Sequence, residues 1–354
     1  MNIKSILLAS AAATAVVSAA TAVVSGAQAA DAIVAAEPEP VEYVRVCDAY
    51  GTGYFYIPGT ETCLKINGYI RLQVDVAPNA SSISASGGGS VPNDSDWDAR
   101  TRGQVQFTAK SDTEYGPLTG LIVIQTNADN ATDQKAQLDS AYIDIAGFRA
   151  GLFYSWWDDG LTGETDDIGS PVTLHNSIRY QYETSEFYAG ISVDELEDSP
   201  FYHGEAANNW GVGVAVAGRA GVFTYQVTAG YDTDNEEGAV RAMGTVPIGP
   251  GILSLAGIYS SNPNAYYNKA EWVVAGEYAV KATDKLKFTP AFQYYGHYGI
   301  VGDEFNDEND AWKVGLTIDY QFVDNFAAKI SLQYLDPDGA EDVTSGFLRL
   351  QRTF

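Results

Sequence analysis

Alternation of apolar and polar residues, repeated along short segments, limits the folds open to this chain more than any other feature. One such segment interleaves Trp312, Val314, Leu316, Ile318 and Tyr320 with Lys313, Gly315, Thr317 and Asp319. Period-two alternation predicts β-strands with one apolar and one polar face. Charges in mid-strand on the polar face and aromatic residues at segment ends favour a water-filled lumen between two interfacial girdles. We therefore predict a transmembrane β-barrel, with a soluble β-sandwich as the alternative.

The number of alternating segments predicts the size of this barrel. Sixteen segments occur, at residues 66–76, 99–110, 118–126, 137–145, 148–153, 177–183, 187–194, 210–217, 222–231, 239–246, 252–260, 270–280, 285–295, 311–321, 326–334 and 346–354. Eight long connections alternate with seven short ones. An even strand count with short periplasmic turns and long outer loops is typical of bacterial barrels. We expect an all-β fold, a closed 16-stranded antiparallel transmembrane β-barrel.

The start of the chain predicts export. Residues 1–29 have one positive charge, Lys4, an apolar centre from Ile6 to Val24, and a small-x-small ending at Ala29. This pattern is typical of a cleaved signal peptide, and the alternative is an N-terminal membrane anchor. We expect an N-terminal segment at 30–65, a barrel at 66–354, and a location in the outer membrane of a Gram-negative bacterium.

Composition excludes two other classes of protein. The chain has 46 acidic and 20 basic residues, a formal charge of −26, whereas nucleic-acid binding needs a basic face. Its mean hydropathy is −0.13, so the apolar residues are dispersed, and a helical membrane bundle would need several apolar runs of about 20 residues. The partners we expect from sequence therefore include outer-membrane lipid and lipopolysaccharide but no nucleic acid.

A barrel of this size predicts a channel. Sixteen strands enclose a lumen too wide for side chains to fill, so ions and small hydrophilic solutes should diffuse through it passively, without a cofactor. The alternatives are a surface receptor or adhesin, and a substrate-specific channel. An enzyme is not expected, because His175, His203 and His297 fall in predicted loops and no G-x-S-x-G motif occurs. The acidic runs at 232–237 and 303–308 do not match a calcium-binding EF-hand loop.

Cys47 and Cys63 are the only cysteines of the chain. Because exported proteins meet an oxidising environment, we expect the two to form a disulfide. The disulfide would close a loop rich in glycine and proline at the start of the mature protein.

Both ends of the chain resemble the alphaproteobacterial porin family. The resemblance lies in residues 41–51, 53–60, 63–64 and 68–69, in the opening residues 1–5, and in the last six residues, 349–354. It implies a sixteen-stranded, homotrimeric general-diffusion porin of the outer membrane. The terminal Phe354, with Leu348 and Leu350, suits recognition by the barrel-assembly machinery. Arg352 stands where an aromatic residue is commonest in outer-membrane barrels.

The same resemblance implies a pore-constricting loop, because the family's third outer loop folds into the lumen and residues 154–176 match it in position. Its carboxylates would face the water of the pore, and they are Asp158, Asp159, Glu164, Asp166 and Asp167. Strand parity turns four arginines inward, and ring closure makes them neighbours: Arg71, Arg100, Arg102 and Arg349. We expect acid and base to face each other across a narrow gap. The alternatives are an exposed acidic loop and scattered lumen cations.

The abundance of acid predicts the sign of ion selectivity. Acidic loops at the outer mouth concentrate cations, and four guanidinium groups are outnumbered by the five carboxylates of the 154–176 loop. We expect a modest preference for cations in dilute salt that fades as screening increases.

Overall fold

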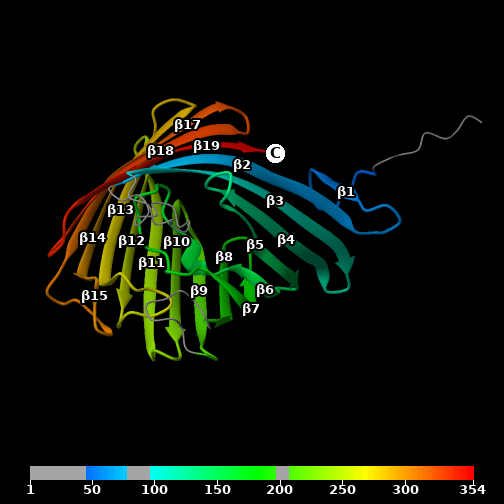
Figure 1. Ribbon diagram of the computed structural model, residues 1–354. Helices are drawn as coiled ribbons and strands as arrows, with labels where there is room; N and C mark the ends of the chain where they lie inside the picture. The colour runs from blue at the N-terminus through cyan, green and yellow to red at the C-terminus, as the bar shows by residue number, and fades with distance from the viewer. Residues whose placement is uncertain (1–44, 78–95, 197–206) are drawn as a thin grey trace, which may run out of the picture. The chain divides into compact units, whose positions relative to one another are not determined.

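The alternating segments form strands that close into a barrel (Figure 1). The computed structural model describes residues 45–77, 96–196 and 207–354, so the predicted signal peptide at 1–29 lies outside the described residues. The first eight barrel strands are β2 (Cys63–Val76), β3 (Trp97–Thr113), β4 (Gly116–Ala128), β5 (Gln134–Ile145), β6 (Phe148–Tyr154), β7 (Leu174–Glu183), β8 (Phe187–Glu195) and β9 (Trp210–Ala220). The other eight are β10 (Phe223–Asp232), β11 (Glu237–Ile248), β12 (Gly251–Ser260), β13 (Ala270–Lys281), β14 (Leu286–Tyr298), β17 (Ala311–Val323), β18 (Phe326–Pro337) and β19 (Val343–Thr353).

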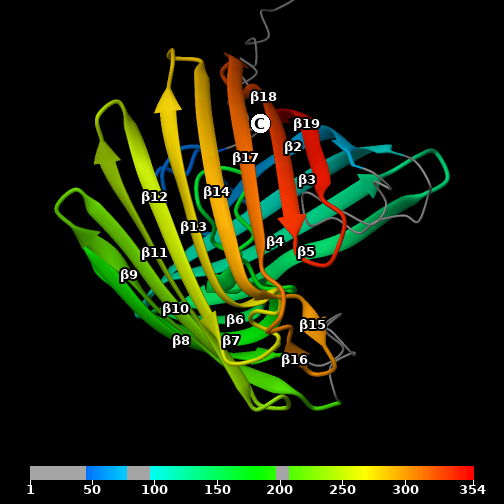
Figure 2. The same ribbon diagram turned by 90° about the vertical axis from the view of Figure 1, so that its left-hand side faces the viewer.

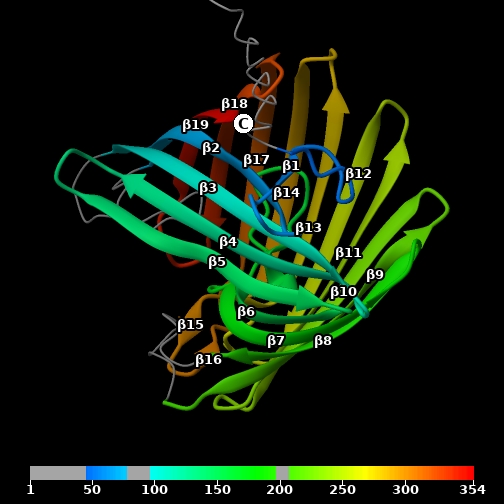
Figure 3. The same ribbon diagram turned by 90° about the vertical axis from the view of Figure 1, so that its right-hand side faces the viewer.

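Each barrel strand pairs antiparallel with its neighbours in the sequence, and β19 pairs with β2 to close the ring. Figure 2 shows β9–β14 with β17 and β18 as one curved wall, and Figure 3 shows β2–β8 as the wall facing it. Closure satisfies the backbone of every barrel strand in lipid, where an open edge would leave polar groups without partners. The predicted 16-stranded antiparallel barrel is confirmed.

Alternation determines which face of each strand turns outward. On β13, Val274 is 52% exposed, whereas its neighbours Val273 and Ala275 are each 1% exposed on the opposite face. The outward residues of a barrel in a membrane contact lipid, so their exposure here marks the lipid-facing side.

Seven short turns lie at one end of the barrel, and the longer connections lie at the other. The turn between β5 and β6 consists of Ala146 and Gly147 alone, with φ of 51° and 85°. Positive φ at both positions is the geometry of a type I′ turn, which follows the twist of the two strands. Two outer connections contain further elements, the 3₁₀ turn η1 (Trp156–Asp158) and the hairpin of β15 (Ile300–Val301) with β16 (Glu304–Phe305).

Two histidines do not lie in loops as expected. His175 is in β7 and is 3% exposed, and His297 is in β14, while His203 lies outside the described residues. Both strands are longer than the alternating segments predicted: β7 begins at Leu174 and β14 ends at Tyr298, so each includes its histidine. Within the described part of the chain, no helix is long and apolar enough to cross a membrane.

A small hairpin covers the edge of β2 where β19 ends (Figure 1). The terminal Phe354 exchanges backbone hydrogen bonds with Gly68, and β1 (Tyr54–Tyr56) pairs with Cys63–Lys65 on the same edge of β2. Strand β1 therefore continues the line of β19 and is the seventeenth strand of the sheet. The expected disulfide between Cys47 and Cys63 is present and fastens this segment to β2.

Replacing both cysteines with serine should release this hairpin from the edge of β2. A disulfide closing a loop of about 15 residues stabilises by about 3 kcal/mol. We expect the folded variant to be cleaved by protease between residues 47 and 63 much faster than the native protein, with the remaining barrel intact. Limited proteolysis read by mass spectrometry measures this, and equal cleavage of the two proteins would contradict the assignment.

Candidate functional site

The connection between β6 and β7 folds into the barrel; we call residues 155–173 the inner loop. It is the green segment inside the barrel in Figures 2 and 3. Trp156 and Trp157 of η1 are buried at its start. The loop therefore occupies part of the lumen that the wall side chains leave open.

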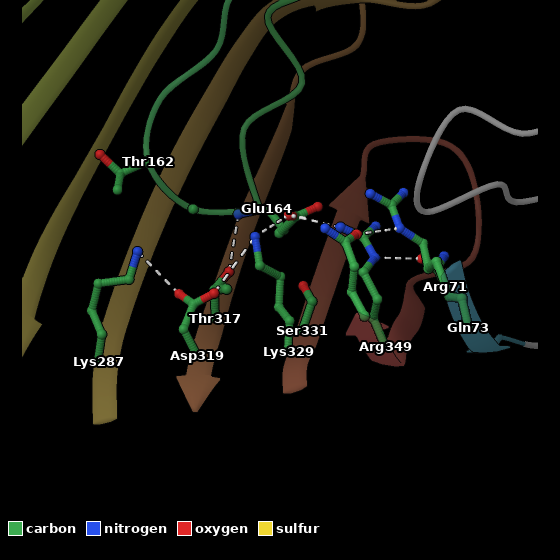
Figure 4. Close-up of polar contacts among 12 residues, drawn as sticks. Arg71, Gln73, Thr162, Glu164, Lys287, Thr317, Asp319, Lys329, Ser331 and Arg349 are labelled. Atoms are coloured by element: carbon green, nitrogen blue, oxygen red, sulfur yellow. Dashed lines mark hydrogen bonds and ion pairs between the residues drawn. The ribbon is translucent and has the colours of Figure 1, made fainter. Parts of the chain in front are cut away.

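Backbone amides of the inner loop bond to side chains of the barrel wall. Gly163 donates to the carboxylate of Glu277 on β13 at 2.8 Å, and Thr162 donates to the same carboxylate. Glu164 donates its N–H to Thr317 Oγ1 on β17 at 2.9 Å (Figure 4). Asp167 donates its N–H to Gln293 Oε1 on β14 at 2.8 Å. These bonds satisfy loop amides that would otherwise be buried without acceptors.

The loop approaches the wall most closely at Gly315 on β17. A Cβ at this position would lie 2.2 Å from Thr165 Oγ1, closer than nonbonded atoms approach. Thr165 itself is completely buried. Only glycine leaves room for the loop here.

Glu164 lies in a row of alternating charges across the wall (Figure 4). Its carboxylate pairs with Lys329 on β18, and with Arg349 Nη1 on β19 at 3.4 Å. Lys329 also lies 3.6 Å from Asp319, which pairs with Lys287 at 3.0 Å. The row joins the tip of the inner loop to four neighbouring strands, β14, β17, β18 and β19.

The four arginines named from sequence lie on β19, β2 and β3, which ring closure makes adjacent. In the strand register, Arg71 is opposite Arg102, and Arg349 and Arg100 are both opposite Gln73. Amide side chains hold three of them: Arg349 bonds to Gln73 at 2.7 Å, Arg71 to Gln351 at 2.8 Å, and Arg102 to Asn127 at 2.8 Å. The result is a fixed cationic surface on the inner wall.

The five loop acids do not share one environment. Glu164 contacts Arg349, whereas Asp167 pairs with Lys269. Asp158 accepts a hydrogen bond from Thr173 and Asp159 one from Gln226, while Asp166 accepts one from the N–H of Leu161. A cavity of about 810 Å³ beside the loop is lined by Asp158, Glu164, Asp166, Asp167, Lys313 and Arg349, among others.

Burial and neighbouring charge separate these carboxylates. Burial raises the pKa of Asp158 and that of Asp166, and neighbouring carboxylates raise both further. Burial also opposes the ionisation of Asp167, but the charges of Lys269 and Lys313 outweigh it and lower its pKa. Acidification should therefore discharge Asp158 and Asp166 before Asp167.

A second inward segment was not expected from sequence. Residues 261–269, between β12 and β13, turn into the barrel and bury Tyr266 and Tyr267 completely. The ring of Trp157 lies 6.3 Å from that of Tyr266 and 6.4 Å from that of Tyr267. Two adjacent tyrosines in an otherwise polar connection were the available signal. The two inward segments together form an apolar cluster on one side of the lumen.

His175 has structural contacts at both ring nitrogens. His175 is buried between the carbonyl oxygens of Val172 and Glu195, at 3.0 and 3.1 Å, so both ring nitrogens are engaged in structure. Among the described residues, no three His, Cys, Asp or Glu side chains are grouped to hold a metal ion. The inner loop and charged wall side chains therefore lie together in the lumen.

Comparison with known proteins gives a consistent result. The profile of the Porin subfamily matches residues 31–348. Outer membrane protein IIIA of Rhizobium leguminosarum bv. viciae is 65% identical over 98% of this chain and 93% of its own length. Porin Omp2a of Brucella suis biovar 1 is 32% identical, with 100% of both chains covered. The crystal structure of the outer membrane channel DcaP of Acinetobacter baumannii has a similar fold, with a TM-score of 0.63 and 12% identity over 84% of this chain and 99% of that one.

Substituting Gly315 with alanine should displace the inner loop, since the new methyl group would overlap Thr165. Amides 162–167 should then exchange hydrogen faster. Gly120→Ala is the matched control, because a Cβ there meets nothing within 4 Å. Hydrogen–deuterium exchange measures the effect, and equal protection of the loop in both variants would contradict the packing described.

Proposed function

Because this chain belongs to the porin subfamily, we propose that its inner loop and the arginines of β19, β2 and β3 form the narrowest part of an outer-membrane channel. The protein is a porin of the outer membrane, through which ions and small hydrophilic solutes diffuse passively. Its family and its porin relatives point to a channel rather than an enzyme.

The observation that carries this proposal is the contact between Glu164 and Arg349. It joins the acidic inner loop to the cationic wall at the seam of the barrel. Arg71 and Arg102 lie beside this contact, and the cavity beside the loop carries Asp158, Asp166 and Asp167. Solutes would pass between fixed charges of opposite sign, which order water and discriminate by charge.

Charge selectivity should follow from the acids that the wall does not neutralise. Glu164 is paired with Arg349 and Lys329, so it contributes little net field. Asp158, Asp159 and Asp166 make no ion pair among the described residues. With the acidic outer loops they should favour cations.

We also propose a homotrimer whose interface is the outer face of β19 and β2–β5. Strands β2, β4 and β5 turn no aromatic side chain outward, and within this face only β3 turns out aromatic residues, Trp97 and Phe107. The opposite wall carries outward aromatic residues near its outer end, on β9, β10, β12, β13, β14, β17 and β18: Trp210, Tyr231, Tyr259, Trp272, Tyr294, Trp312 and Tyr334. Such girdles anchor lipid-facing surfaces at the membrane interface, so a face whose strands mostly lack outward aromatic residues suits contact with another subunit.

The other partners are proposed on chemical grounds. The apolar outward belt suits outer-membrane lipid, and in an outer membrane the outer loops would face lipopolysaccharide. Phe354 pairs with Gly68 at the seam, and a terminal aromatic residue there suits recognition by the barrel-assembly machinery.

Neutralising Asp158, Asp159 and Asp166 together to Asn should weaken cation preference. The zero-current potential across a KCl gradient measures it, in dilute salt where the Debye length is about 10 Å at 0.1 M. Acidification should act in the same direction and begin above the usual carboxyl range, because the pKa values of Asp158 and Asp166 are raised. Selectivity for anions in the native channel at low salt would refute the predicted preference for cations.

A bulky side chain introduced into the proposed interface on β19 and β2–β5 should prevent trimer formation. Ala141 on β5 is outward, so Ala141→Phe should place a bulky ring in the interface and yield monomers on native gels and by crosslinking. Ala229→Phe on β10 is the control, because that outward position faces lipid and should tolerate a ring. Equal yields of trimer from both variants would contradict the proposed location of the interface.

A further inference from the structure

Arg241 on β11 lies behind the inner loop and is completely buried. Its Nη2 donates to the carbonyl oxygen of Trp156 at 2.7 Å, and its Nη1 donates to those of Trp157 at 3.2 Å and Ile168 at 2.9 Å. Trp156 and Trp157 begin the loop, and Ile168 belongs to its returning limb. One guanidinium group therefore joins both limbs of the loop to the wall.

Burial of this charge is unusual, because arginine is almost never fully buried unless it is paired. Among the ion pairs of the described residues, none includes Arg241. Backbone carbonyl oxygens take the place of a carboxylate partner. The planar guanidinium has five donors in a rigid fork, which suits three converging acceptors as a lysine ammonium would not.

The second inward segment, residues 261–269, also holds the inner loop, from the side opposite Arg241. Trp157 lies with its ring 5.1 Å from the Arg241 guanidinium, and it also faces Tyr266 and Tyr267. The Tyr267 hydroxyl donates to the carbonyl oxygen of Asp167 at 3.2 Å. The start of the loop is thus enclosed between β11 and residues 261–269.

We propose that Arg241 is the positioning residue that holds the inner loop in the lumen and so fixes the width of the channel. The inference rests on the proposed function, in which this loop is the constriction. Arg241 acts through backbone oxygen atoms, so it sets where the loop lies without contacting the solute. Without it, the loop should move between docked and displaced positions.

The test compares Arg241→Gln and Arg241→Lys with Arg219→Gln. Arg219 is an exposed cation at the turn end of β9, and its side chain makes no hydrogen bond or ion pair with the inner loop within the described structure. The substitution Arg219→Gln therefore removes one positive charge from the inner face, as Arg241→Gln does, but leaves the contacts of the inner loop in place. Heat-modifiable migration on gels confirms that each barrel folds.

Arg241→Gln should raise hydrogen exchange at amides 162–167 by roughly ten-fold, the scale expected when charge-assisted hydrogen bonds are lost. Single channels should show a larger mean conductance and more open-channel noise, and liposome swelling should admit larger sugars. Arg241→Lys, which keeps the charge but not the fork, should lie between this variant and the native protein. Arg219→Gln should match the native protein in exchange, noise and size limit.

Unchanged exchange and unchanged noise in a folded Arg241→Gln barrel would overturn the positioning role. Faster loop exchange with unchanged conductance and size limit would support the attachment by Arg241 but refute the inner loop as the constriction. If Arg241→Gln does not fold, Arg241→Lys decides alone, and native behaviour of that variant would overturn the proposal.

Discussion

The need to satisfy every backbone polar group in lipid is the constraint on which this structure depends. It requires β19 to pair with β2, because an open edge in hydrocarbon would be costly. Closure then determines the rest of the wall. It places Arg349 beside Arg71, although 277 residues separate them in the chain, and it sends each strand's polar face to the lumen. The cationic surface is a product of ring closure and not of any local motif.

A ring of sixteen strands leaves a space that wall side chains cannot fill, and two inward segments occupy part of it. Residues 261–269 and the start of the inner loop form an apolar cluster against β11–β14. The inner wall of β19, β2 and β3 is polar. The passage is therefore displaced toward the arginines. Hydrophobic packing inside this channel therefore determines where the water-filled passage lies, and it excludes water only from one side of the lumen.

Sequence reasoning recovered the barrel because alternation is a local signal that survives without knowledge of contacts. It also identified the four arginines, since strand parity and closure are enough to place them. It did not find Arg241 or the inward turn at Tyr266 and Tyr267. The role of Arg241 and the burial of the two tyrosines both depend on where connections fold inside the barrel, and alternation within strands does not predict that. The different surroundings of the loop acids were equally out of reach, because Lys269 comes from the second inward segment and Lys329 from β18, both far from the loop in sequence.

The seam has a further consequence for anyone who handles this protein. Phe354 follows β19 and pairs with Gly68, and β1 begins opposite Lys65, so the edge of β2 between them spans only Asn67 and Ile66. Residues added after Phe354 would run directly into β1 and compete for its place. A purification tag at the C-terminus would therefore disturb the seam and the disulfide-bonded hairpin together. An insertion in the outer connection at 338–342 would leave both untouched.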